Sequence, residues 1–100
     1  MKDERLKRPV FFVSDRTGIT SETLGHALLT QFGSVAFEYF SLPFITSGDK
    51  ARKAVREINE AGERSGQRPI VFSTLVKEDY KPVIAECDAH LIDFFDAFIM

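Results

Sequence analysis

The residues of this chain best suited to bind a ligand are gathered in one short segment, Ser14–Thr20, which reads SDRTGIT. Three hydroxyl groups in this segment can hydrogen-bond phosphate oxygens, and Arg16 can add a charged clamp. Gly18 has no side chain, so a ligand can approach the backbone closely there. If a helix begins directly after the segment, its free N–H groups favour anions as well. The candidate phosphate- or partner-binding residues of the segment are Ser14, Asp15, Arg16, Thr17, Gly18 and Thr20.

Two carboxylates at the same corner leave a second interpretation open. Asp15 and Glu22 would each repel a phosphate unless they turn away or a metal ion bridges them. In the second interpretation the segment is a structural turn. Gly18 then makes the turn, Thr20 caps the following helix, and Glu22 complements the helix dipole. The residue types alone are compatible with either role.

Complete nucleotide-binding motifs are absent from the sequence. It contains no G-x-x-x-x-G-K-[ST] pattern, and no G-x-G-x-x-G pattern follows an expected strand. Residues Asp15–Thr20 resemble in part the flavodoxin phosphate loop, [ST]-x-T-G-x-T, with a carboxylate in place of the first hydroxyl. No complete ATP or dinucleotide site is therefore encoded in these residues.

Four apolar segments with strand character alternate with segments of helical length. The expected strands are Val10–Val13, Phe37–Leu42, Ile70–Phe72 and His90–Phe94. The expected helices run from about Thr20 to Phe32, from Asp49 to Arg64 and from Glu78 to Cys87. This alternation predicts an α/β fold with an open, mostly parallel sheet in βαβαβαβ order, Rossmann- or flavodoxin-like. The first and third strands are almost entirely apolar, which is typical of strands covered on both faces, whereas the second suits an edge.

Each expected helix has an apolar stripe that should pack on the sheet. In the first helix, which Gly33 should stop, the stripe is Leu24, Ala27, Leu28 and Phe32. In the second helix it is Ala51, Ala54, Val55, Ile58 and Ala61. In the third it is Tyr80, Val83, Ile84 and Cys87, with Pro82 in the first turns, where proline is tolerated.

A crevice is expected between the first and third strands. Ligands of open α/β sheets bind beyond the carboxyl ends of the strands, where the winding direction reverses. The third strand ends in Ser73 and Thr74, whose hydroxyls should face the Ser14–Thr20 segment across this crevice. Ser73 and Thr74 are therefore two further candidate binding residues. A phosphoacceptor receiver domain would carry an aspartate there, so that class is excluded.

Composition excludes several classes of function. Thirteen basic and fifteen acidic residues give a net charge of −2, with no basic excess for binding nucleic acid. No apolar run approaches the roughly 18 residues of a membrane-spanning helix. The single cysteine, Cys87, cannot form an internal disulfide, which indicates the reducing cytoplasm. We expect His26 to be a packing or surface residue and His90 to be a core or edge residue. Two separated histidines and one cysteine do not have the spacing of a metal-binding set.

The chain is long enough for one small domain. Residues 1–8 are polar and of mixed charge, and predict a flexible arm, whereas residues 9–100 predict the domain. The final run, Phe95–Met100, is apolar and has no helix cap or stop signal. We therefore expect the N-terminal segment of a longer protein, whose other part buries the phenylalanines near Met100.

A long collinear stretch resembles the opening of the phosphoenolpyruvate synthase regulatory proteins, which are related to the pyruvate, phosphate dikinase regulatory proteins. The likeness covers the chain from Pro9 onward and is carried by Val10–Thr20, Glu22–Phe32, Leu42–Phe44, Pro69–Leu75 and Leu91–Phe95. The resemblance implies a bifunctional enzyme. One activity is that of an ADP-dependent serine/threonine kinase, which phosphorylates a threonine of phosphoenolpyruvate synthase (pyruvate, water dikinase) and inactivates it. The other removes that phosphate with inorganic phosphate and releases pyrophosphate.

The resemblance also implies that the glycine-rich nucleotide loop and the catalytic residues lie beyond Met100. ADP and inorganic phosphate are then ligands of the full-length protein, and this segment alone should be inactive. The implied partner is the dikinase, and a homo-oligomer is compatible with the sequence. Two alternatives stay open: a flavodoxin-like FMN-binding module, suggested by the T-G-x-T pattern, and a docking domain that presents its phenylalanine-rich end to a partner.

Overall fold

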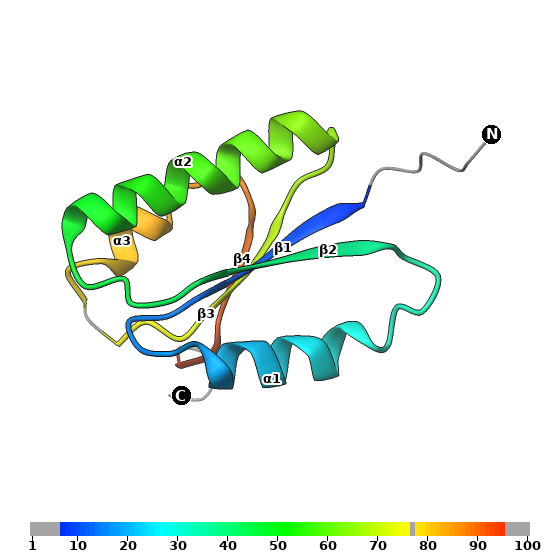
Figure 1. Ribbon diagram of the computed structural model, residues 1–100, viewed down its shortest axis with the longest axis horizontal. Coiled ribbons are helices and arrows are strands. Elements are labelled where there is room, and N and C mark those ends of the chain that lie inside the picture. Colours follow the sequence, from blue (N-terminus) through cyan, green and yellow to red (C-terminus); the bar gives the residue numbers. More distant parts are fainter. Residues whose placement is uncertain (1–6, 77, 96–100) are drawn as a thin grey trace.

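The computed structural model describes residues 7–76 and 78–95, in which four strands alternate with three helices (Figure 1). The strands are β1 (Arg8–Val13), β2 (Phe37–Leu42), β3 (Ile70–Ser73) and β4 (His90–Asp93). The helices are α1 (Ile19–Leu29), α2 (Gly48–Ser65) and α3 (Lys81–Ile84). The predicted βαβαβαβ order is confirmed. Arg8, the last residue of the predicted arm, is the first of β1, and the final residues 96–100 lie outside the described part of the chain.

The strands form one open, parallel sheet in the order β2-β1-β3-β4. In its register, Phe12 of β1 lies between Ser41 of β2 and Phe72 of β3, and Phe72 pairs in turn with Ile92 of β4. The chain first moves from β1 to β2 and then crosses back to β3 on the other side of β1. The winding direction therefore reverses between β1 and β3, as predicted, and β2 lies at an edge, also as predicted.

The sheet is covered by α2 and α3 on one face and by α1 on the other (Figure 1). Because side chains alternate along a strand, the two central strands supply both cores. Phe11 and Val71 pack toward α2 and α3, whereas Phe12 and Phe72 pack toward α1. All of β1 after Arg8 and most of β3 are buried, which confirms the prediction from their apolar sequence.

Helix α2 follows the prediction closely. Ser47 caps its N-terminus by accepting a hydrogen bond from the Lys50 N–H at 3.1 Å, and Gly66 ends it with a φ of 71°. The predicted stripe packs on the sheet: its buried members are Ala51, Ala54, Ile58 and Ala61, and Val55 is half-buried. The apolar repeat was sufficient to locate this helix to within one residue at each end.

Helix α1 differs from the prediction at both ends. It begins at Ile19, after Gly18 with a φ of 89°, and it ends at Leu29 with Thr30 as its C-cap. The predicted roles of Thr20 as the N-cap and Gly33 as the stop are therefore wrong. The chain enters the helix through a left-handed residue that glycine accommodates, and the Thr30 hydroxyl donates to the Ala27 carbonyl at the other end.

The face of α1 that meets the sheet also differs from the prediction. The buried residues are Ser21, Gly25 and Leu29, whereas Leu28 and Phe32 of the predicted stripe are 47% and 55% exposed. A Cβ atom on Gly25 would lie 2.5 Å from the Phe12 ring and 2.9 Å from the Phe72 ring. The helix backbone therefore lies directly on the phenylalanines of the sheet, and this close approach requires glycine at position 25.

Helix α3 is a single turn, much shorter than the predicted Glu78–Cys87 segment. Pro82 lies in its first turn, as predicted. Ile84 and Cys87 are buried, and Tyr80 and Val83 pack partly against the same core. The predicted apolar spacing is therefore used for packing, although turns rather than a regular helix carry most of it.

Candidate functional site

The Ser14–Thr20 segment lies at the carboxyl edge of the sheet, at the reversal point between β1 and β3. A hollow of about 620 Å³ opens beside it, formed by the loops that follow β1, β2 and β3. Its lining residues are Asp15, Arg16, Ile45, Thr46, Val76, Glu78 and Tyr80. This is the position at which open α/β sheets bind their ligands.

The loop after β1 is held to the loop after β2 by backbone hydrogen bonds. The Ser14 carbonyl accepts from the Ile45 N–H, and the Arg16 carbonyl accepts from the Phe44 N–H, each at 2.9 Å. Phe44 adopts a φ of 59°, which is uncommon for a residue with a side chain. These bonds fix the backbone of Arg16, while its side chain remains exposed at the hollow.

Two of the candidate hydroxyls serve the turns that carry them. The buried Ser14 hydroxyl oxygen accepts from the Arg16 N–H at 2.9 Å, and that of Ser73 accepts from the Leu75 N–H at 3.3 Å. Thr74 is buried as well, and its N–H donates to the Val13 carbonyl at 2.9 Å. The ends of β1 and β3 therefore lie side by side as predicted, although Ser73 and Thr74 are buried and are not among the residues that line the hollow.

The start of α1 combines features of both interpretations of this segment. Gly18 makes the turn, and its carbonyl accepts from the buried Ser21 hydroxyl at 3.0 Å. No side chain caps the helix, so its first N–H groups lack the partner that a capping residue would provide. Thr17 and Thr20 are exposed beside it. The binding role of this segment stays a prediction.

The two carboxylates that complicated the sequence interpretation are both engaged in contacts. Asp15 accepts a hydrogen bond from the Val76 N–H at 3.0 Å, and Glu22 accepts one from the Ser41 hydroxyl of β2. Asp15 thus joins the segment to the loop after β3, and Glu22 joins α1 to β2.

Sequence reasoning missed the far wall of the hollow. The Tyr80 hydroxyl donates to the Thr46 carbonyl at 2.9 Å and so links the loop after β2 to the turn before α3. Both residues follow strands whose carboxyl ends meet at the edge where β1 ends. A search for polar residues a few positions after every expected strand would have found them.

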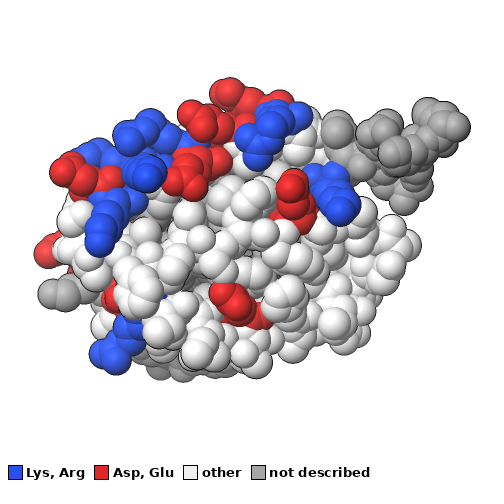
Figure 2. Space-filling view, in the orientation of Figure 1, with Lys and Arg blue, Asp and Glu red and all other residues white. Residues whose placement is uncertain are grey.

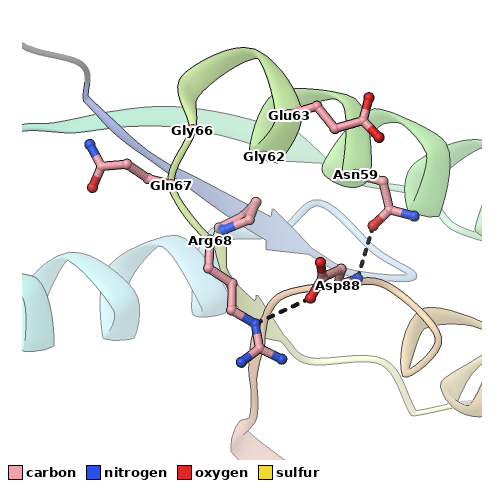
Figure 3. A pocket seen from close by; sticks show the side chains of 8 residues that line it. Asn59, Gly62, Glu63, Gly66, Gln67, Arg68 and Asp88 are labelled. Carbon is pink, nitrogen blue, oxygen red and sulfur yellow. Dashed lines mark hydrogen bonds and ion pairs between the residues drawn. The ribbon is translucent and has the colours of Figure 1, made fainter.

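A second hollow, of about 570 Å³, lies at the opposite edge of the sheet (Figure 3). It is lined by residues of the α2 C-terminus and of the segments that lead into β3 and β4. Its polar groups bond to one another: the Asp88 N–H donates to the Asn59 side-chain oxygen at 2.9 Å, and Arg68 lies 3.4 Å from the Asp88 carboxylate. This hollow faces the amino ends of the strands, so we assign its contacts a structural role.

The single cysteine and the two histidines lie outside the hollow beside Ser14–Thr20. Burial raises the pKa of the Cys87 thiol, which keeps it protonated and a poor nucleophile. The His26 ring packs against Phe12 and Tyr39, with centroids 5.1 and 4.4 Å away, as predicted for a packing residue. His90 is exposed on β4 at the edge of the sheet, one of its two predicted places.

Within residues 7–76 and 78–95, no group of three or more histidine, cysteine or acidic side chains could hold a metal ion. In the same ranges, no helix is long and apolar enough to cross a membrane. The charged residues of α2 have mixed sign, as with Arg52 beside Asp49, and the surface over β2 carries few charges (Figure 2).

Comparison with known proteins shows the family to which the chain belongs. The family model described as Kinase/pyrophosphorylase matches residues 10–100, and the chain belongs to this family. A relative from Alcanivorax borkumensis, named "Putative phosphoenolpyruvate synthase regulatory protein", is 49% identical over 94 residues. Proteins of the same name from Pseudomonas putida F1 and Alkalilimnicola ehrlichii are 50% and 54% identical over 94 and 93 residues. The family resemblance predicted from the sequence is confirmed.

The aligned part of the chain is 94% of its own length but 35% of the Alcanivorax and Pseudomonas relatives and 34% of the Alkalilimnicola relative. The chain thus spans about a third of the length of the curated relatives it matches. Membership of the family favours a regulatory kinase segment over a flavodoxin-like module.

Proposed function

We propose that this chain is the N-terminal part of a bifunctional cytoplasmic enzyme that regulates phosphoenolpyruvate synthase. The whole enzyme transfers phosphate from ADP to a threonine of the synthase, and it removes that phosphate with inorganic phosphate to release pyrophosphate. The observation that carries this proposal is the family match over residues 10–100, together with the regulatory name of relatives about half identical to the chain.

Within that enzyme we assign this segment an accessory role. The sequence contains no glycine-rich nucleotide loop with a lysine, so the phosphate-transfer chemistry belongs to the part of the enzyme that this chain does not span. The hollow at the carboxyl edge of the sheet is then a subsite for a phosphate group or for the threonine loop of the synthase. Its support is its place at the reversal point and the exposed guanidinium of Arg16.

The proposal is tested with two proteins. The first is the isolated chain, and the second is a chimera in which this chain replaces the matched 94 residues of the Alcanivorax borkumensis relative. Each is incubated with phosphoenolpyruvate synthase and ADP, and phosphothreonine on the synthase is measured by mass spectrometry. We expect phosphorylation and loss of synthase activity with the chimera, and neither with the isolated chain.

Two controls make the result decisive. The intact Alcanivorax protein shows that the assay works, and omission of ADP shows that the donor is required. Phosphothreonine formed by the isolated chain would contradict the accessory role. A chimera that folds but leaves the synthase unmodified, beside an active intact relative, would contradict the proposed function of this segment.

A further inference from the structure

The two faces of the sheet are covered unequally. Helices α2 and α3 cover one face, whereas α1 alone covers the other (Figure 1). Helix α1 packs on β1 and β3 through the face that contains Gly25. Helix α1 thus lies over β1 and β3 rather than over β4, and Phe94, just after β4, is buried on the same side against Phe72 with ring centroids 5.4 Å apart.

An apolar groove lies where that covering ends. It has a volume of about 770 Å³ and runs between α1 and the strands β3 and β4. The apolar residues that line it include Leu28, Phe32, Ile70, Phe72, Leu91 and Ile92. Leu28 and Phe32 are 47% and 55% exposed, and Ile92 is 37% exposed. A contiguous exposed apolar surface of this kind marks an interaction site.

The exposure of Leu28 and Phe32 follows from how α1 packs on the sheet. Ser21, Gly25 and Leu29 occupy the sheet-facing side, so Leu28 and, in the following turn, Phe32 are directed to the groove. Leu28 belongs to α1, whereas Phe32 lies three residues beyond its end. Helix α1 thus has two contact surfaces, one for its own sheet and one left for another element.

The strand beside the groove is also open. Within residues 7–76 and 78–95, β4 pairs with β3 and with no other strand. Natural proteins cover or pair such edges, because exposed strand groups otherwise recruit other chains. The open edge of β4 and the apolar groove meet at Leu91 and Ile92. The two features therefore form one continuous surface.

We propose that an amphipathic helix packs in this groove beside α1, and that it comes from the part of the kinase/pyrophosphorylase chain that this segment does not span. The aligned segment is 35% of the Alcanivorax relative, so most of that protein is available to cover it. A helix fits because sheet faces in α/β folds are covered by neighbouring helices about 8–10 Å apart. The inference rests on family membership and does not depend on the proposed phosphate transfer.

The test compares the accessibility of single cysteines in the isolated chain and in the chimera. Leu28→Cys places a thiol in the groove, and Val35→Cys places one at a site of similar exposure, 43%, outside it. Maleimide labelling of each site is followed by mass spectrometry of the peptide that contains it. We expect Leu28→Cys to be labelled about tenfold more slowly or less in the chimera than in the isolated chain, because local opening then limits the reaction. Labelling of Val35→Cys should be unchanged.

A cross-linker attached at Leu28→Cys in the chimera tests the helical form of the occupant. Cross-links should reach residues three or four apart, whereas residues two apart would indicate a strand and would overturn the helix. Equal labelling of Leu28→Cys in both proteins would overturn the proposal. So would protection in the isolated chain that rises with its concentration, because a second copy would then fill the groove.

The buried Cys87 reports the folding of every sample, since its rapid labelling marks an unfolded protein. If the chimera does not fold, the same pair of substitutions is made at the aligned positions of the intact Alcanivorax protein, with the same expected difference. Because the readout is accessibility, a chimera without kinase activity can still show the protection. The proposed function and this docking surface can therefore fail independently.

Discussion

The carboxylate of Asp15 accepts a hydrogen bond from the backbone N–H of Val76 at 3.0 Å, and it thereby joins the loop after β1 to the loop after β3. These loops flank the reversal point of the sheet. Both residues line the hollow of the candidate site. The negative charge of Asp15 would repel a phosphate. The same carboxylate holds together two of the loops that form the candidate site.

Replacing this carboxylate should therefore reduce stability. We expect Asp15→Ala to lower the free energy of unfolding by about 1 kcal/mol, the usual net value of a partly exposed hydrogen bond. Urea denaturation of the isolated chain measures the change. Asp79→Ala is the matched control, because that residue is exposed and lies in the neighbouring turn. Equal effects of the two substitutions would show that the contact with Val76 contributes nothing.

A methyl group at Gly25 should damage the contact between α1 and the sheet. Its Cβ would lie 2.5 Å from the Phe12 ring, so the helix must move away or the ring must leave its position. We expect Gly25→Ala to cost about 1–3 kcal/mol, the range for overpacking a core, although alanine favours helices. Thermal unfolding measures it. Gly33→Ala, where no atom lies within 4 Å of the new Cβ, should change stability little, and a comparable loss there would contradict the explanation.

The limits of sequence reasoning are clearest in α1. Helix α2 could be located because its apolar stripe is regular and the residues between its members are charged or polar. In α1 the larger apolar residues Leu28 and Phe32 suggested the wrong face, because hydrophobicity alone does not reveal that Gly25 must pack against two phenylalanine rings. The information lay in pairs of residues distant in sequence, which periodicity does not report.

The candidate site, too, could be predicted from the sequence only in part. The sequence was sufficient to place the loop after β1 at the reversal point, because strand order follows from alternation and handedness. It could not show that Tyr80 reaches the Thr46 carbonyl, since that contact depends on how two irregular loops fold over one another. Nor could it separate hydroxyls that stabilise turns, such as that of Ser14, from those that remain exposed.

The buried thiol of Cys87 predicts a pH dependence of stability. Burial raises its pKa above the ordinary value of 9.0; Asp88 adds to this rise, while a backbone hydrogen bond and Arg68 oppose it. The folded state therefore holds this proton more tightly than the unfolded state. The thiol's contribution to stability is complete below about pH 9 and is lost as the pH rises from there through the folded pKa.

We expect the free energy of unfolding to fall more steeply above about pH 9 in this chain than in its Cys87→Ala variant. Urea denaturation at a series of pH values measures both slopes. The comparison of slopes removes the constant cost of the cavity and the titrations that both proteins share. Parallel curves would contradict the expected difference in the pKa of this thiol between the two states.

The role of Arg16 separates the two interpretations of its loop. If its exposed guanidinium binds a phosphate at the hollow, Arg16→Ala in the chimera should raise the KM for inorganic phosphate in the dephosphorylation reaction by about three- to tenfold. Arg16→Lys should recover part of the loss, because it keeps the charge but not the paired donors. Arg56→Ala, which removes an exposed charge on α2, should leave the KM unchanged. If the loop is a structural turn alone, all three variants will show the same KM. The bonds that fix the loop use the backbone of Arg16, so loss of its side chain leaves them in place and a change in KM would report binding.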